Sequence, residues 1–197
     1  YTDNRYYQQE LYLSAANRFK LFPWWEASFS ADYQFNLLDA DLRDFAYPRR
    51  HTLLASVATS LRFGRAELQA SLLGTLVHDR TRGESAPDKR KLTPAVFLSW
   101  RPFARADFNL RAFYKRIFRM PTLNDLYYTF VGNINLDPEF TTQYDVGFTY
   151  GWKFEHTWLR HLSIQADLYY NEVENKIVAT PTSNFFRWTM VNLGNVE

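Results

Sequence analysis

The chain has 197 residues, of which 18% are aromatic and 22% charged, with a net charge of +2. Its mean hydropathy of -0.41 is too polar for helical membrane spans, no apolar run reaches about eighteen residues, and the aromatic content excludes disorder. Cysteine is absent, which excludes disulfides and thiolate metal sites. The nearly balanced charge argues against a nucleic-acid partner, and we interpret the charged segment 88–91 as a solvated loop edge.

Alternation of apolar and polar side chains is the dominant pattern of the sequence. From Trp25 to Leu37 every second residue is apolar or aromatic, which is typical of a β-strand with one apolar and one polar face. About nine to eleven tilted residues suffice to cross a bilayer, and this run is longer. In chain order the same pattern predicts about nine strands joined by hairpins, at 7–20, 25–37, 51–63, 66–76, 92–100, 107–115, 144–154, 162–171 and from Arg187 onward.

The connections between the expected strands alternate between short turns and long polar loops. The short ones are 21–24, 63–65, 102–105 and 155–160, and the long ones are 39–48, 79–90, 118–142 and 172–186. Short periplasmic turns and long external loops are typical of outer-membrane barrels. A periplasmic-side aromatic girdle is predicted from the tryptophans near the short turns, which are Trp24, Trp25, Trp100, Trp152 and Trp158. The sequence therefore predicts an all-β transmembrane antiparallel β-barrel.

Nine strands cannot close such a barrel, because an open sheet leaves unpaired edges in lipid. We therefore expect the chain to be an arc of a larger barrel, with any export signal outside it. The expected lipid face includes Phe29, Val57, Leu68, Leu72, Phe148 and Ile164, and the expected lumen face carries polar residues of both signs, among them Asp32, Glu67, Arg111, Lys115 and Asp167.

The longest loop contains a dense series of loop-forming and polar residues. Pro121 and Pro138 restrict the backbone, and Gly132 with Asn133 permits positive φ. Asp125 and Glu139 can accept hydrogen bonds from loop amides or pair with Arg119. These features fit a loop scaffold at the strand start, and they also fit a contribution to a ligand-receiving mouth.

The segment 118–150, FRMPTLNDLYYTFVGNINLDPEFTTQYDVGFTY, resembles the characteristic barrel stretch of TonB-dependent outer-membrane receptors. The matching positions are Arg119, Pro121, Thr122, Asp125, Leu126, Tyr127, Gly132, Asn133, Leu136, Pro138, Glu139, Tyr144, Asp145 and Gly147. Asp125 and Asp145 stand where Glu is commoner, and both keep the carboxylate. Asn192 to Val196 is similar to the Asn-x-Gly strand that follows in these receptors.

The resemblance implies a partial TonB-dependent receptor barrel over residues 1–197, with about nine of roughly 22 strands, in the outer membrane of a Gram-negative cell. It implies uptake of a scarce nutrient such as an iron chelate, cobalamin or an oligosaccharide. The implied partners are outer-membrane lipid, that small nutrient, and TonB, the last only through a plug domain absent from this chain. Cofactors, metals and catalytic residues are not expected.

Two other classes of protein share parts of this pattern. A passive porin would show the same strands and girdles without the motif between Arg119 and Glu139. An outer-membrane enzyme would need a nucleophile or an acid pair with a base at the loop rim, and no such set stands out. The histidines have no ligand-like spacing. Tyr127, Tyr128 and Phe130 in the long loop could stack on a ligand ring or pack the loops together.

Overall fold

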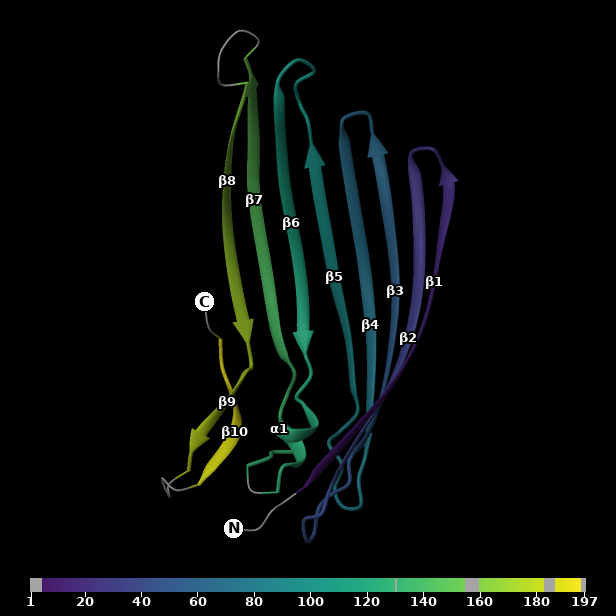
Figure 1. Cartoon of the computed structure of the whole chain (residues 1–197), viewed down its shortest axis with the longest axis vertical. Coiled ribbons are helices and arrows are strands. Elements are labelled where there is room, and N and C mark those ends of the chain that lie inside the picture. The colour runs from purple at the N-terminus through teal and green to yellow at the C-terminus, as the bar shows by residue number, and fades with distance from the viewer. Residues whose placement is uncertain (1–4, 130, 155–159, 183–186, 196–197) are drawn as a thin grey trace.

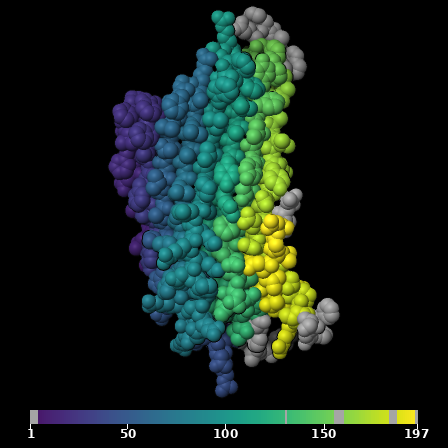
Figure 2. All heavy atoms as spheres, turned by 180° about the vertical axis from the view of Figure 1, so that it is seen from behind, coloured from purple at the N-terminus to yellow at the C-terminus, as the bar shows by residue number. Residues whose placement is uncertain are grey.

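Eight antiparallel strands form one continuous sheet in the computed structural model, in the order β1 to β8 without crossovers. The structure describes residues 5–129, 131–154, 160–182 and 187–195. Successive strands lie side by side in chain order across Figures 1 and 2. The strands are β1 Tyr6–Phe22, β2 Trp25–Ala40, β3 Arg49–Phe63, β4 Ala66–Arg80, β5 Lys89–Trp100, β6 Asp107–Arg119, β7 Glu139–Lys153 and β8 His161–Glu174. These bounds confirm the predicted hairpins and extend most of the strands by a few residues.

Short and long connections lie at opposite ends of the sheet, as the sequence predicts. Figure 1 shows the tight turns at its upper end, and the long loops with the helix α1 (Leu123–Tyr127) at its lower end. In the described part of the chain no helix is both long and apolar enough to cross a membrane. The eight strands of the sheet contain 12 to 17 residues each.

The strand register places the predicted apolar residues on one face. Phe29 lies opposite Val57, and Val57 lies opposite Leu72, so the three side chains share a face. Phe148, Ile164 and Leu68 lie on the same face through the pairings of β4 to β8. We call this the outward face. It is uncovered along its length, with Leu92 and Leu168 exposed by 66% and 79%.

Aromatic rings border the outward face at both ends. Near the short turns Trp24 stacks on Phe22 at 5.5 Å and lies 6.0 Å from Phe63 between ring centroids. Towards the long loops the register aligns Tyr114, Tyr144 and Tyr170 across three strands, and we call these residues the tyrosine row. Two aromatic borders around an uncovered apolar band are typical of a transmembrane barrel wall. Trp158, predicted in the girdle near the short turns, lies outside the described residues.

The last predicted strand differs from expectation in its partner. β10 (Trp188–Leu193) pairs with the short strand β9 (Lys176–Pro181) in a separate two-stranded sheet, and not with β8. Asn175, at φ 55, stands between β8 and β9 and redirects the chain. Hydrogen bonds from Met190 N to Val131 O and from Asn133 Nδ2 to Met190 O then hold β10 against the long loop. The eight-stranded sheet is thus one strand smaller than the sequence predicted.

We predict different effects of a buried charge on the two faces of β2. Phe29→Arg, on the outward face, should cost about 2 to 4 kcal/mol in the free energy of folding of the complete barrel into vesicles, because the guanidinium would face hydrocarbon. The neighbouring control Ser30→Arg faces the other side and should cost little. Equal costs at the two positions would show that the faces are assigned wrongly.

Candidate functional site

The long loops pack together at one end of the sheet into what we call the loop cluster, formed by residues 41–48, 81–88, 120–129 and 131–138 with the β9–β10 hairpin. Its apolar core contains most of the described buried hydrophobic side chains, in contrast to the exposed middle of the sheet. The buried members are Leu38, Ala40, Phe45, Ala86, Leu123, Leu126, Tyr127 and Leu136. The cluster is therefore a folded element with its own core, built on the ends of the strands.

Helix α1 begins the motif segment and is fixed by a reciprocal cap. The side chain of Thr122 accepts a hydrogen bond from Asp125 N at 3.1 Å, and Asp125 Oδ2 accepts one from Thr122 N at 2.9 Å. This capping box satisfies two amides that a helix start leaves without partners. The predicted role of Asp125 as an acceptor of loop amides is confirmed, and the helix buries Leu123 and Leu126 against the cluster core.

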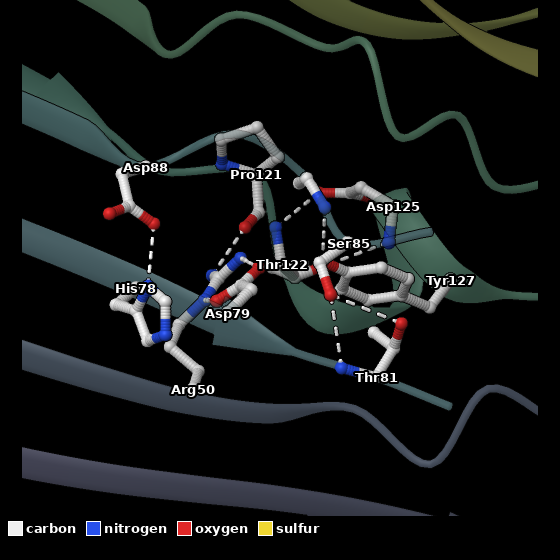
Figure 3. Close-up of polar contacts among 11 residues, drawn as sticks. Arg50, His78, Asp79, Thr81, Ser85, Asp88, Pro121, Thr122, Asp125 and Tyr127 are labelled. Carbon is white, nitrogen blue, oxygen red and sulfur yellow. Dashed lines mark hydrogen bonds and ion pairs between the residues drawn. The ribbon is translucent and has the colours of Figure 1, made fainter. Parts of the chain in front are cut away.

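A buried ion pair joins the sheet to this helix (Figure 3). Arg50 on β3 and Asp79 on β4 lie directly opposite each other and form two hydrogen bonds of 2.8 and 2.9 Å. Arg50 Nη1 also donates to the carbonyl of Pro121 at 2.6 Å, which ties the loop before α1 to the inner side of the sheet. The side chains of Arg50 and Asp79 are nearly inaccessible, at 9% and 4% exposure. Removal of either one would leave the other charge buried and unpaired, which is strongly destabilising.

Tyr127 completes this network from the helix side. Its hydroxyl donates to Asp79 Oδ2 at 3.0 Å and accepts from Ala86 N at 2.9 Å. Burial raises the pKa of Tyr127 well above its usual range, and the Asp79 carboxylate adds to the rise while the Ala86 amide opposes it. The hydroxyl therefore stays protonated as a donor, and it links the helix and the loop that contains Ala86 to the sheet at one point.

Gly132 and Asn133 form the turn that returns the chain across α1. A Cβ at Gly132 would lie 2.6 Å from Leu126 O and 2.7 Å from Tyr128 N, so this position accepts no side chain without a backbone shift. Asn133 N donates to Asp125 O at 2.9 Å, and Asn133 Oδ1 accepts from Asn135 N at 3.0 Å. Neither residue adopts the positive φ that its residue type permits, and close backbone packing is the reason for the glycine.

The end of the motif anchors the β9–β10 hairpin. Leu136 and Pro138 are almost fully buried, and Asn192 on β10 brackets the residue between them by accepting from Asp137 N and donating to Asp137 O. Glu139 accepts from Arg119 at 3.3 Å and from Ile177 N at 3.0 Å. The predicted pairing of Arg119 with Glu139 is confirmed.

The motif residues on β7 point to both faces of the sheet. Tyr144 lies on the outward face, in the tyrosine row, and Asp145 lies on the inward face beside Tyr169 of β8. At Gly147 a Cβ would meet Asp167 Oδ1 at 1.9 Å. The glycine leaves room for the carboxylate of Asp167, which pairs across it with Arg111 at 2.8 Å.

The predicted mouth aromatics have different environments. Tyr127 is 6% exposed and is held inside the loop cluster by its hydrogen bonds, so its ring is not presented to solvent. Tyr128 is 38% exposed, and its ring stacks on Tyr6 with centroids 6.0 Å apart. Phe130 lies outside the described residues. Of the two mouth aromatics that the structure describes, Tyr128 is the one whose ring is exposed to solvent at this end.

The inward face has two hollows lined by polar side chains. One of about 480 Å³ lies beneath α1 and is bordered by amides and hydroxyls, those of Gln8, Gln34, Asn36, Thr52, Thr75, Thr122 and Asn124. Thr75 Oγ1 is buried there without a hydrogen-bond partner among the described residues. The second, of about 620 Å³, lies nearer the short turns and is lined by charges of both signs, including Arg18, Glu26, Arg62, Glu67 and Lys115. Among described residues no cluster of acids and histidines could hold a metal ion.

Sequence reasoning did not single out Arg50 and Asp79, the residues on which the site depends. The tight turn at Gly64, with φ 57, fixes the register of the β3–β4 hairpin from Phe63–Ala66 onward. Extending that register along the two alternating strands places Arg50 opposite Asp79 on the polar face. The charge pair could therefore have been found by counting from the turn, although its contact with Pro121 could not.

Comparison with known proteins agrees with this architecture. A family described as "TonB dependent receptor-like, beta-barrel" matches residues 1–197, and the chain therefore belongs to that family of Gram-negative outer-membrane proteins. The vitamin B12 transporter BtuB of Vibrio vulnificus is 35% identical over 80 residues, which cover 41% of this chain and 12% of BtuB.

Solved structures show the same fold at low sequence identity. The hemophore receptor HasR of Serratia marcescens superposes with a TM-score of 0.75 at 15% identity, over 98% of this chain and 38% of HasR. The FrpB iron transporter of Neisseria meningitidis gives a TM-score of 0.71 at 10% identity, over 98% of this chain and 33% of FrpB. The chain thus spans 38% and 33% of the length of these two proteins.

We predict that the buried ion pair stabilises the complete barrel with its loop cluster. Arg50→Met should lower the free energy of unfolding by about 3 to 5 kcal/mol, because it leaves Asp79 charged, buried and unpaired. It should also open the segment around α1 to protease. Arg49→Met, at the adjacent exposed position, is the matched control and should change both measurements little. A similar loss for the two variants would remove the special role of the pair.

Proposed function

We propose that this chain is part of the wall of an outer-membrane receptor that takes up a scarce nutrient with energy supplied through TonB. The observation that most supports this proposal is the loop cluster, whose motif residues build a folded element over the inward face at the long-loop end. In this proposal the 197 residues supply lipid-facing wall, lumen lining and part of the external mouth. They contribute no chemical catalysis, and the plug that would contact TonB belongs to another part of the receptor.

Two features of the cluster support a ligand-receiving role. The hollow beneath α1 is bordered by amides and hydroxyls, such as those of Gln34 and Thr52, together with Arg50 and apolar side chains. Tyr128 exposes part of its ring at the same end. Neutral hydrogen-bonding groups beside an aromatic ring suit a polar nutrient that is too large for a porin.

The relatives suggest which nutrients to test first. BtuB is named as a vitamin B12 transporter, HasR as a hemophore receptor in complex with heme, and FrpB as an iron transporter. We infer that the substrate is drawn from cobalamins, heme and iron chelates, with oligosaccharides as a further class. A passive porin is the alternative function, and it would have no need of the motif between Arg119 and Glu139.

Uptake by whole cells tests the proposal. The complete receptor should be expressed in cells that lack their own uptake systems, and labelled cobalamin, heme and ferric siderophores should be supplied one at a time. We expect accumulation of at least one of them to require both the receptor and TonB. Accumulation that persists without TonB, or after the proton gradient is collapsed, would instead support a passive channel.

The same assay tests the role of Tyr128. Tyr128→Ala should reduce uptake severalfold while the barrel inserts normally, because the variant loses ring surface at the mouth. Tyr7→Ala is the matched control, since Tyr7 is 60% exposed at the same end on the outward face. Unchanged uptake in Tyr128→Ala would remove this residue from the mouth while leaving the transport proposal in place.

A further inference from the structure

The pairing of the large sheet is interrupted between β5 and β6, towards the long loops. It ends at Ala95 and Lys115, whereas beyond that point β5 stays paired with β4, and β6 with β7. Pro94, the next residue of β5, has no N–H to donate to a neighbouring strand. Segments 89–94 and 116–119 therefore lack ladder hydrogen bonds to each other, and we call the strip between them the seam.

Side chains occupy the seam in place of backbone hydrogen bonds. Lys91 lies opposite Thr75 and therefore starts from the inward face, yet its Nζ lies 5.1 Å from the ring centroid of Phe140 on the outward face. Phe118 lies opposite Phe140 and therefore belongs to the outward face, yet it borders the inward hollow beneath α1. Both residues thus link the two faces of the wall. A seam closed by side chains can open by rotamer changes, without breaking a strand pair.

Two hollows of different character lie on either side of the wall at the seam. The outward one has a volume of about 700 Å³ and is lined by the apolar side chains of Leu53, Ala55, Leu76, Leu92 and Pro94, and also by Arg90, Lys91 and Arg116. We call it the leucine groove. The inward one is the hollow of about 480 Å³ beneath α1. Thr75 lines both, so the two hollows lie on opposite sides of the same stretch of wall.

This arrangement suits a ligand that has a hydrocarbon tail and a polar head. Such a molecule dissolves in the outer leaflet, and its head reaches the hollow beneath α1 only if the tail leaves hydrocarbon or passes through the wall. The first route exposes the tail to water, which is unfavourable in proportion to its apolar area. The seam provides the second route, because the tail can stay among the leucines of the groove while the head enters the hollow.

We propose that the seam admits the tail of an acylated iron chelate, so that the receptor takes up an amphiphilic ligand from the outer leaflet. The inference rests on the proposed function, and it names the substrate class for the same mouth. Lys91 and Phe118 part around the tail, and the head bonds to the amides and hydroxyls beneath α1. Arg90 and Lys91 take part in none of the ion pairs among the described residues, which favours an anionic head.

Whole-cell uptake of a matched pair of chelates tests this inference in the complete receptor. The probes are a radiolabelled ferric tris-catecholate with a dodecyl chain and the same chelate without the chain. A Cβ at Gly74 would lie 3.5 Å from Leu92 Cδ2, an ordinary contact, so Gly74→Leu fits the sheet and fills the leucine groove. It should lower uptake of the acylated chelate roughly tenfold, because the new side chain takes the space of the tail, and leave the other chelate unaffected.

The comparison between variants decides the outcome, because partitioning into the membrane favours an acylated chelate in any receptor. Ala166→Leu is the matched control, since it enlarges an exposed outward position on β8, away from the groove, and it should change neither uptake. Insertion of each variant into the outer membrane is measured in parallel.

A photoreactive diazirine at the tip of the dodecyl chain gives a readout that does not depend on uptake. In outer-membrane vesicles that contain the complete receptor, cross-links should concentrate in residues 53–55, 74–76 and 92–94 and be lost in Gly74→Leu. Cross-links spread evenly over the outward face would place the tail in bulk lipid and overturn the proposal.

The uptake assay separates failure of this inference from failure of the proposed function. No loss in Gly74→Leu, an equal loss of both chelates in that variant, the same selective loss in Ala166→Leu, or no TonB-dependent uptake of the acylated chelate would each overturn the inference. The proposed function would still stand if cobalamin, heme or the chelate without a chain accumulated in a TonB-dependent manner.

Discussion

The structure depends on one constraint, which is that backbone amides and carbonyls in hydrocarbon must bond to other strands because no water is available. The consecutive antiparallel pairings of β1 to β8 meet that requirement within the sheet and leave the side chains free to differ on its two faces. The alternation of apolar and polar residues along each strand follows from this difference between the two faces. An apolar side chain such as Val57 can remain 59% exposed, because lipid replaces the missing core.

The loop cluster is under a different constraint, because it lies at the end of the sheet where water competes with its internal hydrogen bonds. Its polar links are therefore buried and shared, as when Asp79 serves both Arg50 and Tyr127. Most residues of the family motif therefore pack the loop cluster or cap its helix. In the proposed function, ligand contact is assigned to side chains around the folded element, such as Tyr128 and the residues of the hollow beneath α1.

Much of the fold was predictable, because only a β-strand places every second side chain on the same face. The predictions for Arg119 with Glu139 and for Asp125 were also confirmed. Asp125 contacts Thr122 three residues away, whereas Arg119 and Glu139 meet because they lie opposite each other on β6 and β7. Helix α1, with 5 residues, is too short to show a helical period. The position of the β9–β10 hairpin against the long loop depends on Asn133 and Asn192, whose contacts join segments far apart in the chain and cannot be inferred from local pattern.

The most direct test of the central claim, a membrane-spanning wall with the loop cluster outside, is labelling of single cysteines on intact cells. Ser85 and Thr129 are exposed among the long loops, and Gly64 is exposed in a short turn; this chain has no cysteine of its own. In the complete receptor, an impermeant thiol reagent should modify cysteines at 85 and 129 on whole cells, and one at 64 only after the outer membrane is opened. Labelling at position 64 on intact cells would contradict the account.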